Sequence, residues 1–117
     1  MLIKVLAIDD DPNMTTLLKL FLTGDRFEFL AANTSIDGIE AARCWEPDVI
    51  LLDLMLPGIS GWEVCKQIRA FSQVPILILS VVTESEQLRQ AINNGANDYI
   101  SKPITKGELI SHIIRLT

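Results

Sequence analysis

The chain has 117 residues, 49% of them hydrophobic, and this is enough for one domain, residues 1–117, with a single core. Its formal net charge of −5 argues against direct nucleic-acid binding, and no apolar run reaches the roughly 18 residues that a membrane span needs. With only two cysteines and no C-x-x-C pair, neither a disulfide framework nor a zinc site is favoured, and we expect a soluble, cytoplasmic protein.

The first half of the chain alternates apolar, β-branched segments with segments of helical periodicity. It begins with a predicted strand from Ile3 to Ile8. A helix is predicted over Met14 to Leu22, where apolar residues recur at the spacing of one helix face, with a proline near the start and a glycine after the end. A strand from Phe27 to Ala32, a helix from Ser35 to Cys44 and a strand from Val49 to Leu52 follow.

The second half continues the alternation. A helix is predicted from Trp62 to Ala70, a strand from Pro75 to Leu79 and a helix from Glu84 to Asn94, which a glycine ends. The last strand is short, Tyr99 to Ile100. The last helix begins at Thr105 with a T-x-x-E capping box and runs to about Leu116.

Strict alternation of strands and helices predicts an α/β fold, in which a five-stranded parallel sheet carries helices on both faces. In such open sheets, binding sites form outside the carboxyl ends of the strands, near the point where the strand order reverses. With the flavodoxin-like order 2-1-3-4-5, the first and third strands are neighbours. The residues at the strand ends therefore decide the function.

Four of the predicted strands end in polar residues: Asp9-Asp10-Asp11, Asp53, Ser80 and Ser101-Lys102. A single polar strand end is explained by the chain reaching water, but four together indicate a site. Clustered carboxylates repel one another unless a cation neutralises them, and Mg²⁺ suits such oxygen ligands while leaving room for phosphate oxygens. We therefore expect a magnesium site that accepts a phosphoryl group, with Asp53 as the nucleophile, Lys102 as the positive charge and Ser80 as a hydroxyl donor.

These residues lie in motifs that resemble those of response regulator receiver domains, the phosphoacceptor domains of two-component systems. The resemblance covers essentially the whole chain and rests on four segments: Ile8-Asp9-Asp10-Asp11-Pro12, Asp48 to Gly58, Leu79-Ser80, and Gly95 to Pro103. It implies that Asp53 is phosphorylated by a sensor histidine kinase or a phosphotransfer protein. It also implies that Mg²⁺ is bound by Asp10 directly, by Asp9 through water, by Asp53 and by the Met55 carbonyl.

The resemblance also implies a switch rather than an enzyme that turns over a separate substrate. Ser80 moves toward the phosphoryl group, Tyr99 rotates inward, and the surface of the fourth helix, last strand and last helix changes for an output domain or another partner. The kinase would dock around the first helix and the loop after Lys102, and the Lys102–Pro103 bond is expected to be cis.

Some positions depart from the usual family pattern. Val81 is bulkier than the usual small residue and is expected to narrow access to the site. Met55 and Val82 occupy positions that influence hydrolysis of the aspartyl phosphate in this family. Both are apolar, and neither can orient an attacking water, so slow autodephosphorylation is predicted.

The last helix resembles that of receivers from winged-helix transcription factors, which form homodimers on activation. His112 and Ile114 replace basic residues of the shared dimer face, and Asn97 replaces an acid, so these departures argue against such a dimer while leaving it open. We interpret His112, Lys66 and Arg69 as solvated helix residues.

Three other functions remain as alternatives. A haloacid-dehalogenase-like phosphatase would use the D-x-D of Asp9 and Asp11, but Asn13 departs from that motif, the chain is short for that fold and Asp53 would have no role. A flavin or nucleotide module would need a Gly-rich phosphate loop where this chain is acidic. A receiver-like interaction module that is never phosphorylated would not need the complete set of site residues.

Overall fold

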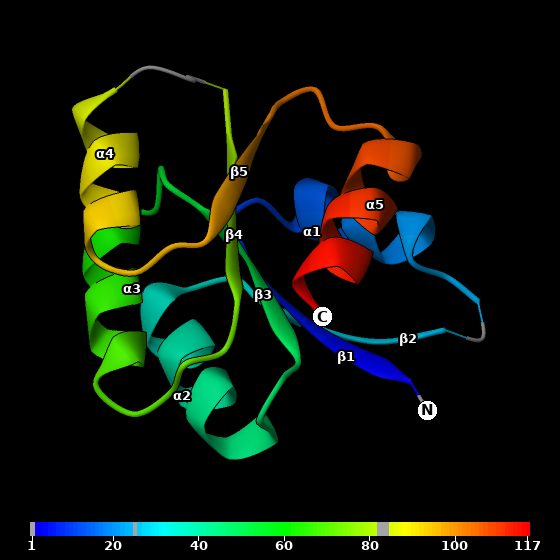
Figure 1. Ribbon diagram of the computed structural model, residues 1–117, viewed down its shortest axis with the longest axis horizontal. Coiled ribbons are helices and arrows are strands. Elements are labelled where there is room, and N and C mark those ends of the chain that lie inside the picture. Colours follow the sequence, from blue (N-terminus) through cyan, green and yellow to red (C-terminus); the bar gives the residue numbers. More distant parts are fainter. Residues whose placement is uncertain (1, 25, 82–84) are drawn as a thin grey trace.

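The computed structural model describes residues 2–24, 26–81 and 85–117, in which five strands and five helices alternate (Figure 1). The elements are β1 (Ile3–Ile8), α1 (Pro12–Phe21), β2 (Phe27–Ala32), α2 (Ser35–Trp45), β3 (Val49–Asp53), α3 (Gly61–Arg69), β4 (Ile76–Ser80), α4 (Glu86–Asn93), β5 (Asp98–Ser101) and α5 (Lys106–Leu116). Every predicted strand and helix is confirmed, with ends that differ by at most two residues. The predicted start of the fourth helix at Glu84 lies outside the described residues.

The sheet has the predicted order β2-β1-β3-β4-β5, and all its strand pairs are parallel. Every residue of β3 and β4 is buried, whereas the edge strands β2 and β5 expose part of their surface. Central parallel strands are covered on both faces, which explains why their sequences are continuous apolar runs. The α/β fold class is confirmed.

Helices cover both faces of the sheet, with α2, α3 and α4 on one side and α1 and α5 on the other (Figure 1). Successive side chains of each strand point to opposite faces, so each strand contributes to two cores. In β3, Ile50 belongs to the core that contains Ile68 of α3. Its neighbour Leu51 belongs to the core that contains Leu18 of α1 and Leu109 of α5.

Helix α2 lies unusually close to β1. A Cβ atom at Gly38 would come within 2.7 Å of the Ile8 side chain, so glycine permits this approach. Thr34 caps the helix, since its side-chain oxygen accepts a hydrogen bond from the Asp37 N–H at 3.0 Å. The junction between β2 and α2 is thereby held against the carboxyl end of β1.

The two cysteines are a buried core residue, Cys65, and an exposed residue on α2, Cys44. Burial raises the pKa of Cys65 to about 12, so this thiol stays protonated at neutral pH. Within the described part of the chain, none of the helices is long and apolar enough to cross a bilayer.

Two of the three helix residues predicted to be solvated are not. The Arg69 guanidinium donates hydrogen bonds to the carbonyls of Gly95 and Ser72 and to the side-chain oxygen of Asn97. His112 keeps only 22% of its side chain exposed, and its Nε2 lies 3.7 Å from Asp98 Oδ2. Arg69 is thus bound by loop carbonyls, and His112 lies against an acid of the edge strand β5. Lys66 is exposed, as predicted.

Candidate metal centre

The carboxyl ends of β1 and β3 bring three carboxylates together. The two strands pair with Ile8 opposite Leu52, so Asp9 and Asp53, which follow these residues, are neighbours. One carboxylate oxygen from each of Asp9, Asp10 and Asp53 lies within 4.8 Å of the others. Asp9 and Asp53 are buried, whereas Asp10 is exposed. The site therefore has two buried acids and one acid at its mouth.

Lys102 reaches the same site from the end of β5. Its Nζ lies 3.6 Å from Asp9 Oδ2 and 3.6 Å from Asp53 Oδ1, and only 15% of its side chain is exposed. Its backbone N–H donates a 2.7 Å hydrogen bond to the Ser80 carbonyl at the end of β4, and the Lys102–Pro103 bond is cis, as predicted. One ammonium accompanies three carboxylates and lies close to two of them, so the cluster keeps a surplus of negative charge.

The electrostatic surroundings of Asp9 are unfavourable for its charge. Burial raises the pKa of Asp9 above its ordinary value of 3.8, and nearby Asp53 and Asp10 raise it further, against the Asp11 N–H and Lys102, which lower it. Oδ1 accepts the Asp11 N–H at 3.0 Å, but Oδ2 is buried and has no hydrogen-bond partner among the described residues. An oxygen in this position favours a nearby cation.

The donor set fits a hard divalent cation. Carboxylate oxygens are the ligands that Mg²⁺ prefers, and a hydrated cation among Asp9, Asp10 and Asp53 would neutralise the surplus charge and give the unpaired Asp9 oxygen a partner through a bound water. Mg²⁺ usually keeps several waters, so one exposed ligand beside two buried ones suits its coordination.

The remaining predicted site residues lie at the end of β4, on β5 and directly after β3. Ser80 is buried at the end of β4, opposite Ser101 of β5. The backbone N–H of Met55 donates to Asp53 Oδ1 at 3.3 Å, while its side chain is 67% exposed. Tyr99 lies on β5 with 41% of its surface exposed. The predicted roles of the Met55 carbonyl and of Tyr99 as a switch stay predictions.

Two hollows flank Met55. One of about 340 Å³ is lined by Asp10, Met55 and Gln87 among others, and one of about 270 Å³ by Met55, Ser80, Val81 and Gln87 among others. The first lies beside the carboxylate cluster, because Asp10 lines it, and the second lies beside Ser80. Val81 forms part of the wall of the second hollow, and its bulk is predicted to limit access to the phosphorylation site. Val82, the other position named from the sequence, lies outside the described residues.

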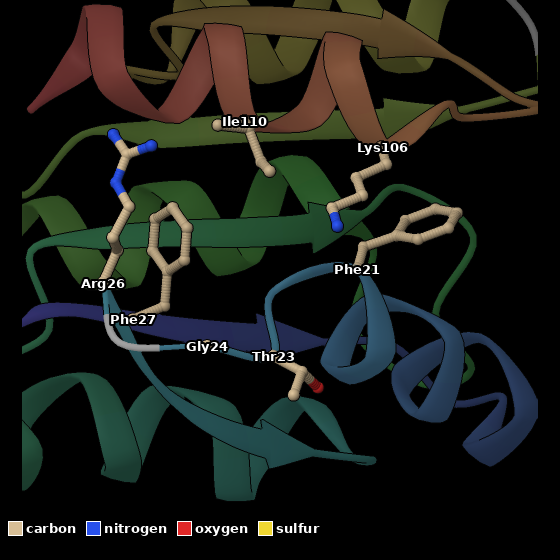
Figure 2. A pocket seen from close by; sticks show the side chains of 7 residues that line it. All are labelled: Phe21, Thr23, Gly24, Arg26, Phe27, Lys106 and Ile110. Carbon is tan, nitrogen blue, oxygen red and sulfur yellow. The ribbon is translucent and has the colours of Figure 1, made fainter.

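A separate hollow of about 210 Å³ lies between α1, β2 and α5 (Figure 2). Figure 2 shows Lys106 and Arg26 entering it from α5 and from the start of β2, with the rings of Phe21 and Phe27 in its walls. None of the clustered carboxylates lines it, so it is not part of the metal centre.

Sequence reasoning missed one polar strand end. Asn33 directly follows β2, and its Nδ2 donates a 2.8 Å hydrogen bond to the Asp9 carbonyl. The signal was present, because Asn33 stands after its strand as Asp9 stands after β1. An amide carries no charge and no obvious chemistry, and so it was not grouped with the carboxylates.

The sequence model of the response regulator receiver domain matches residues 5–114. Among curated proteins, the DNA-binding response regulator MtrA of Mycolicibacterium smegmatis is 36% identical over 110 residues, 94% of this chain and 48% of MtrA. The transcriptional regulatory protein AfsQ1 of Streptomyces coelicolor is 38% identical over 112 residues, 96% of this chain and 49% of AfsQ1. The chain thus spans about half the length of these relatives.

Solved structures show the same architecture. The chemotaxis protein CheY4 of Vibrio cholerae superposes with a TM-score of 0.92 at 28% identity, covering 100% of both chains. The receiver domain of the sensor histidine kinase PA1611 of Pseudomonas aeruginosa, with a magnesium ion coordinated in its active site cleft, has a TM-score of 0.90 at 25% identity. That comparison covers 99% of this chain and 98% of the PA1611 domain.

Proposed function

The chain belongs to the response regulator receiver domain family, and from this premise we propose that it accepts a phosphoryl group on Asp53 in a Mg²⁺-dependent reaction. The observation that carries the proposal is the cluster of Asp9, Asp10 and Asp53 with the Lys102 ammonium 3.6 Å from two of the three carboxylates. A nucleophile, a cation and acidic ligands for a metal are thus present at one edge of the sheet.

The metal would be held by Asp10 directly, by Asp9 through water, by Asp53 and by the Met55 carbonyl. A bound Mg²⁺ supplies positive charge that offsets repulsion between the carboxylates and the incoming phosphoryl oxygens. The unpaired Asp9 oxygen and the magnesium-bound relative from Pseudomonas aeruginosa support this assignment.

The chain's own residues perform the transfer. A carboxylate oxygen of Asp53 attacks phosphorus, the new P–O bond forms as the P–N bond of the donor phosphohistidine breaks, and the donor imidazole leaves with that electron pair. Lys102 and the Ser80 hydroxyl contact the phosphoryl oxygens and stabilise their charge. The domain catalyses only this transfer and the slow hydrolysis of the aspartyl phosphate, in which water takes the phosphoryl group as inorganic phosphate and Asp53 is restored. It therefore acts as a signalling domain rather than as an enzyme with a separate substrate.

Phosphorylation would then be read at the surface of α4, β5 and α5. Ser80 moves toward the phosphoryl group and Tyr99, now partly exposed, rotates inward. The donor is a sensor histidine kinase or a phosphotransfer protein, and the reader is an output domain or a separate partner. The names of MtrA and AfsQ1 support a transcriptional output, with homodimerisation on activation as an alternative readout.

The test is intact mass after incubation with Mg²⁺ and acetyl phosphate, beside Asp53→Asn and a magnesium-free sample. We expect one added phosphoryl group that requires both Mg²⁺ and Asp53. An adduct that persists in Asp53→Asn would contradict the assignment of Asp53. If the wild type forms no adduct, beryllofluoride replaces the donor, and failure to bind it too would favour an interaction module that is never phosphorylated.

A further inference from the structure

We propose that Asn33 and Ser35, at the junction of β2 and α2, position the two loops that supply the metal ligands. The β1–α1 loop carries Asp9 and Asp10, and the β3–α3 loop follows Asp53 and carries Met55. We call Asn33 and Ser35 the β2–α2 brace. The inference rests on the proposed metal site and goes beyond it, because neither residue is a ligand or contacts the phosphoryl group.

Asn33 fixes the backbone of Asp9. The Asp9 N–H donates to the Ala32 carbonyl at 3.1 Å, and the Asp9 carbonyl accepts from Asn33 Nδ2 at 2.8 Å. The backbone pairing of β1 with β2 ends at Ile8 and Ala32, so the Asn33 amide adds one more bond from a side chain. Both the N–H and the carbonyl of Asp9 are therefore held by the end of β2, although Asp9 lies beyond β1.

This hold sets the direction of the Asp9 carboxylate. With the backbone fixed, Oδ1 accepts the Asp11 N–H at 3.0 Å, and Oδ2 lies 3.6 Å from Lys102 Nζ. Asn33 Nδ2 also lies 3.4 Å from the Thr15 hydroxyl oxygen, and that hydroxyl donates to the Pro12 carbonyl at 3.1 Å. The amide thus contacts the start of the β1–α1 loop at Asp9 and the first turn of α1 at Thr15.

Ser35 reaches the other loop. It is buried, and its hydroxyl donates to the Ile59 carbonyl at 3.4 Å, near the end of the β3–α3 loop. Ser35 is the first residue of α2, the helix whose close approach to β1 Gly38 permits. One short segment therefore links the two loops whose spacing determines how far Asp9 and Asp10 lie from Asp53.

Spacing matters more for Mg²⁺ than for a larger cation. Mg²⁺ demands nearly octahedral ligands at short distances, whereas Ca²⁺ accepts longer and irregular coordination. Residues that orient metal ligands typically change metal affinity by about 10- to 100-fold when they are replaced. Loosening the brace should therefore weaken Mg²⁺ binding more than Ca²⁺ binding, whereas a general loss of stability would not change the ratio of the two affinities.

The experiment measures Mg²⁺ and Ca²⁺ dissociation constants by calorimetry for the wild type, Asn33→Ala and Asn13→Ala. Asn13 is the matched control, since it lies in the β1–α1 region and its side chain has no hydrogen bond in the described residues. We expect Asn33→Ala to weaken Mg²⁺ binding about tenfold and Ca²⁺ binding clearly less. Asn13→Ala should match the wild type.

Hydrogen exchange gives a readout without metal. The Asp11 amide donates to the Asp9 carboxylate, so it should exchange faster in metal-free Asn33→Ala than in Asn13→Ala. Ser35→Ala is a milder second variant, for which we expect about a threefold loss of Mg²⁺ affinity. It keeps the test valid if Asn33→Ala does not fold.

The outcomes separate this inference from the proposed function. A wild type that binds no Mg²⁺ contradicts the metal site itself. A wild type that binds Mg²⁺, with an unchanged ratio of Mg²⁺ to Ca²⁺ affinity in both Asn33→Ala and Ser35→Ala, overturns the brace alone.

Discussion

Asp9 and Asp10 are neighbours in the chain, yet their surroundings differ. Asp9 is 2% exposed and has a buried oxygen without a hydrogen-bond partner in the described structure, whereas Asp10 is exposed to water. Burial penalises the charge of Asp9, and Lys102 at 3.6 Å compensates only in part. The ionised form of Asp9 therefore lowers the free energy of unfolding of the metal-free protein.

We predict that Asp9→Asn stabilises the metal-free protein at neutral pH by about 1 kcal/mol. The folded pKa of Asp9 is raised, so wild-type stability falls as pH rises from the ordinary value of 3.8 through the folded value. Below pH 3.8 Asp9 is protonated in both the folded and the unfolded state, so the higher stability of Asp9→Asn should vanish. Urea unfolding in EDTA across this pH range measures it, and a variant less stable than the wild type at neutral pH would show that the Lys102 pair outweighs burial.

The side chain of Met55 should affect the lifetime of the phosphoryl group on Asp53. Met55 lies two residues after Asp53, and its exposed side chain has no group that orients water. The aspartyl phosphate on Asp53 should therefore hydrolyse slowly. Met55→Asn should accelerate the loss of the phosphoryl group roughly tenfold, as followed by intact mass. Leu20→Asn, on the exposed surface of α1, is the control and should leave the rate unchanged.

At the scale of elements, the loop between α4 and β5 is fastened to α3 and β4 by polar groups. The Asn97 side-chain oxygen accepts from the Ile76 N–H at 2.8 Å and from Arg69 Nη2 at 3.0 Å. Arg69 also binds the carbonyl of Gly95, where a positive φ of 110° and contact with the Arg69 side chain both favour glycine. This network sets where β5 begins. It therefore also affects the position of Lys102, which directly follows β5.

We predict that Asn97→Ala lowers the free energy of unfolding by about 2 kcal/mol, because it leaves the buried Ile76 N–H without its acceptor. Asn97→Asp keeps that acceptor and adds a charge opposite Arg69, so it should be neutral or slightly stabilising. Chemical denaturation of both variants measures the difference. Equal losses in the two would show that the amide N–H₂, and not its oxygen, stabilises the loop.

The elements themselves were predictable because periodicity reports burial. The runs in β3 and β4 are apolar throughout since both sheet faces are covered, and the heptad-like spacing in α1 marks its one buried face. The contacts of Arg69 were not predictable. Two of its three partner residues, Gly95 and Asn97, lie more than twenty residues away, and no pattern within α3 encodes them.

At the scale of the whole molecule, four strands deliver their last residues to one edge of a parallel sheet. This rule made the cluster of Asp9, Asp53 and Lys102 predictable once the strands were recognised. The unequal burial of Asp9 and Asp10 and the bond from Asn33 could not be predicted in the same way. Both depend on the path of loops, which strand patterns do not specify.

The molecule as a whole should be stabilised by magnesium. Binding only to the folded state adds about 2.7 kcal/mol at a free concentration one hundred times the dissociation constant. Thermal unfolding in Mg²⁺ and in EDTA measures the gain. Because the chain carries a net charge of −5, the control is KCl at the same ionic strength, and an equal gain in KCl would assign the effect to screening.

The all-parallel sheet also constrains how the chain reaches its native state. Neighbouring strands cannot be joined by a tight turn, and even the nearest pair along the chain, β4 and β5, matches Leu77 with Asp98. Strand β1 lies between β2 and β3, so it stays half-paired until Val49–Asp53 has been synthesised. Each pairing must close a long loop before contacts stabilise it, and folding is therefore expected on the order of milliseconds or slower. Until then, a newly made chain presents the unpaired edge and the apolar side chains of β1 to solvent and to chaperones.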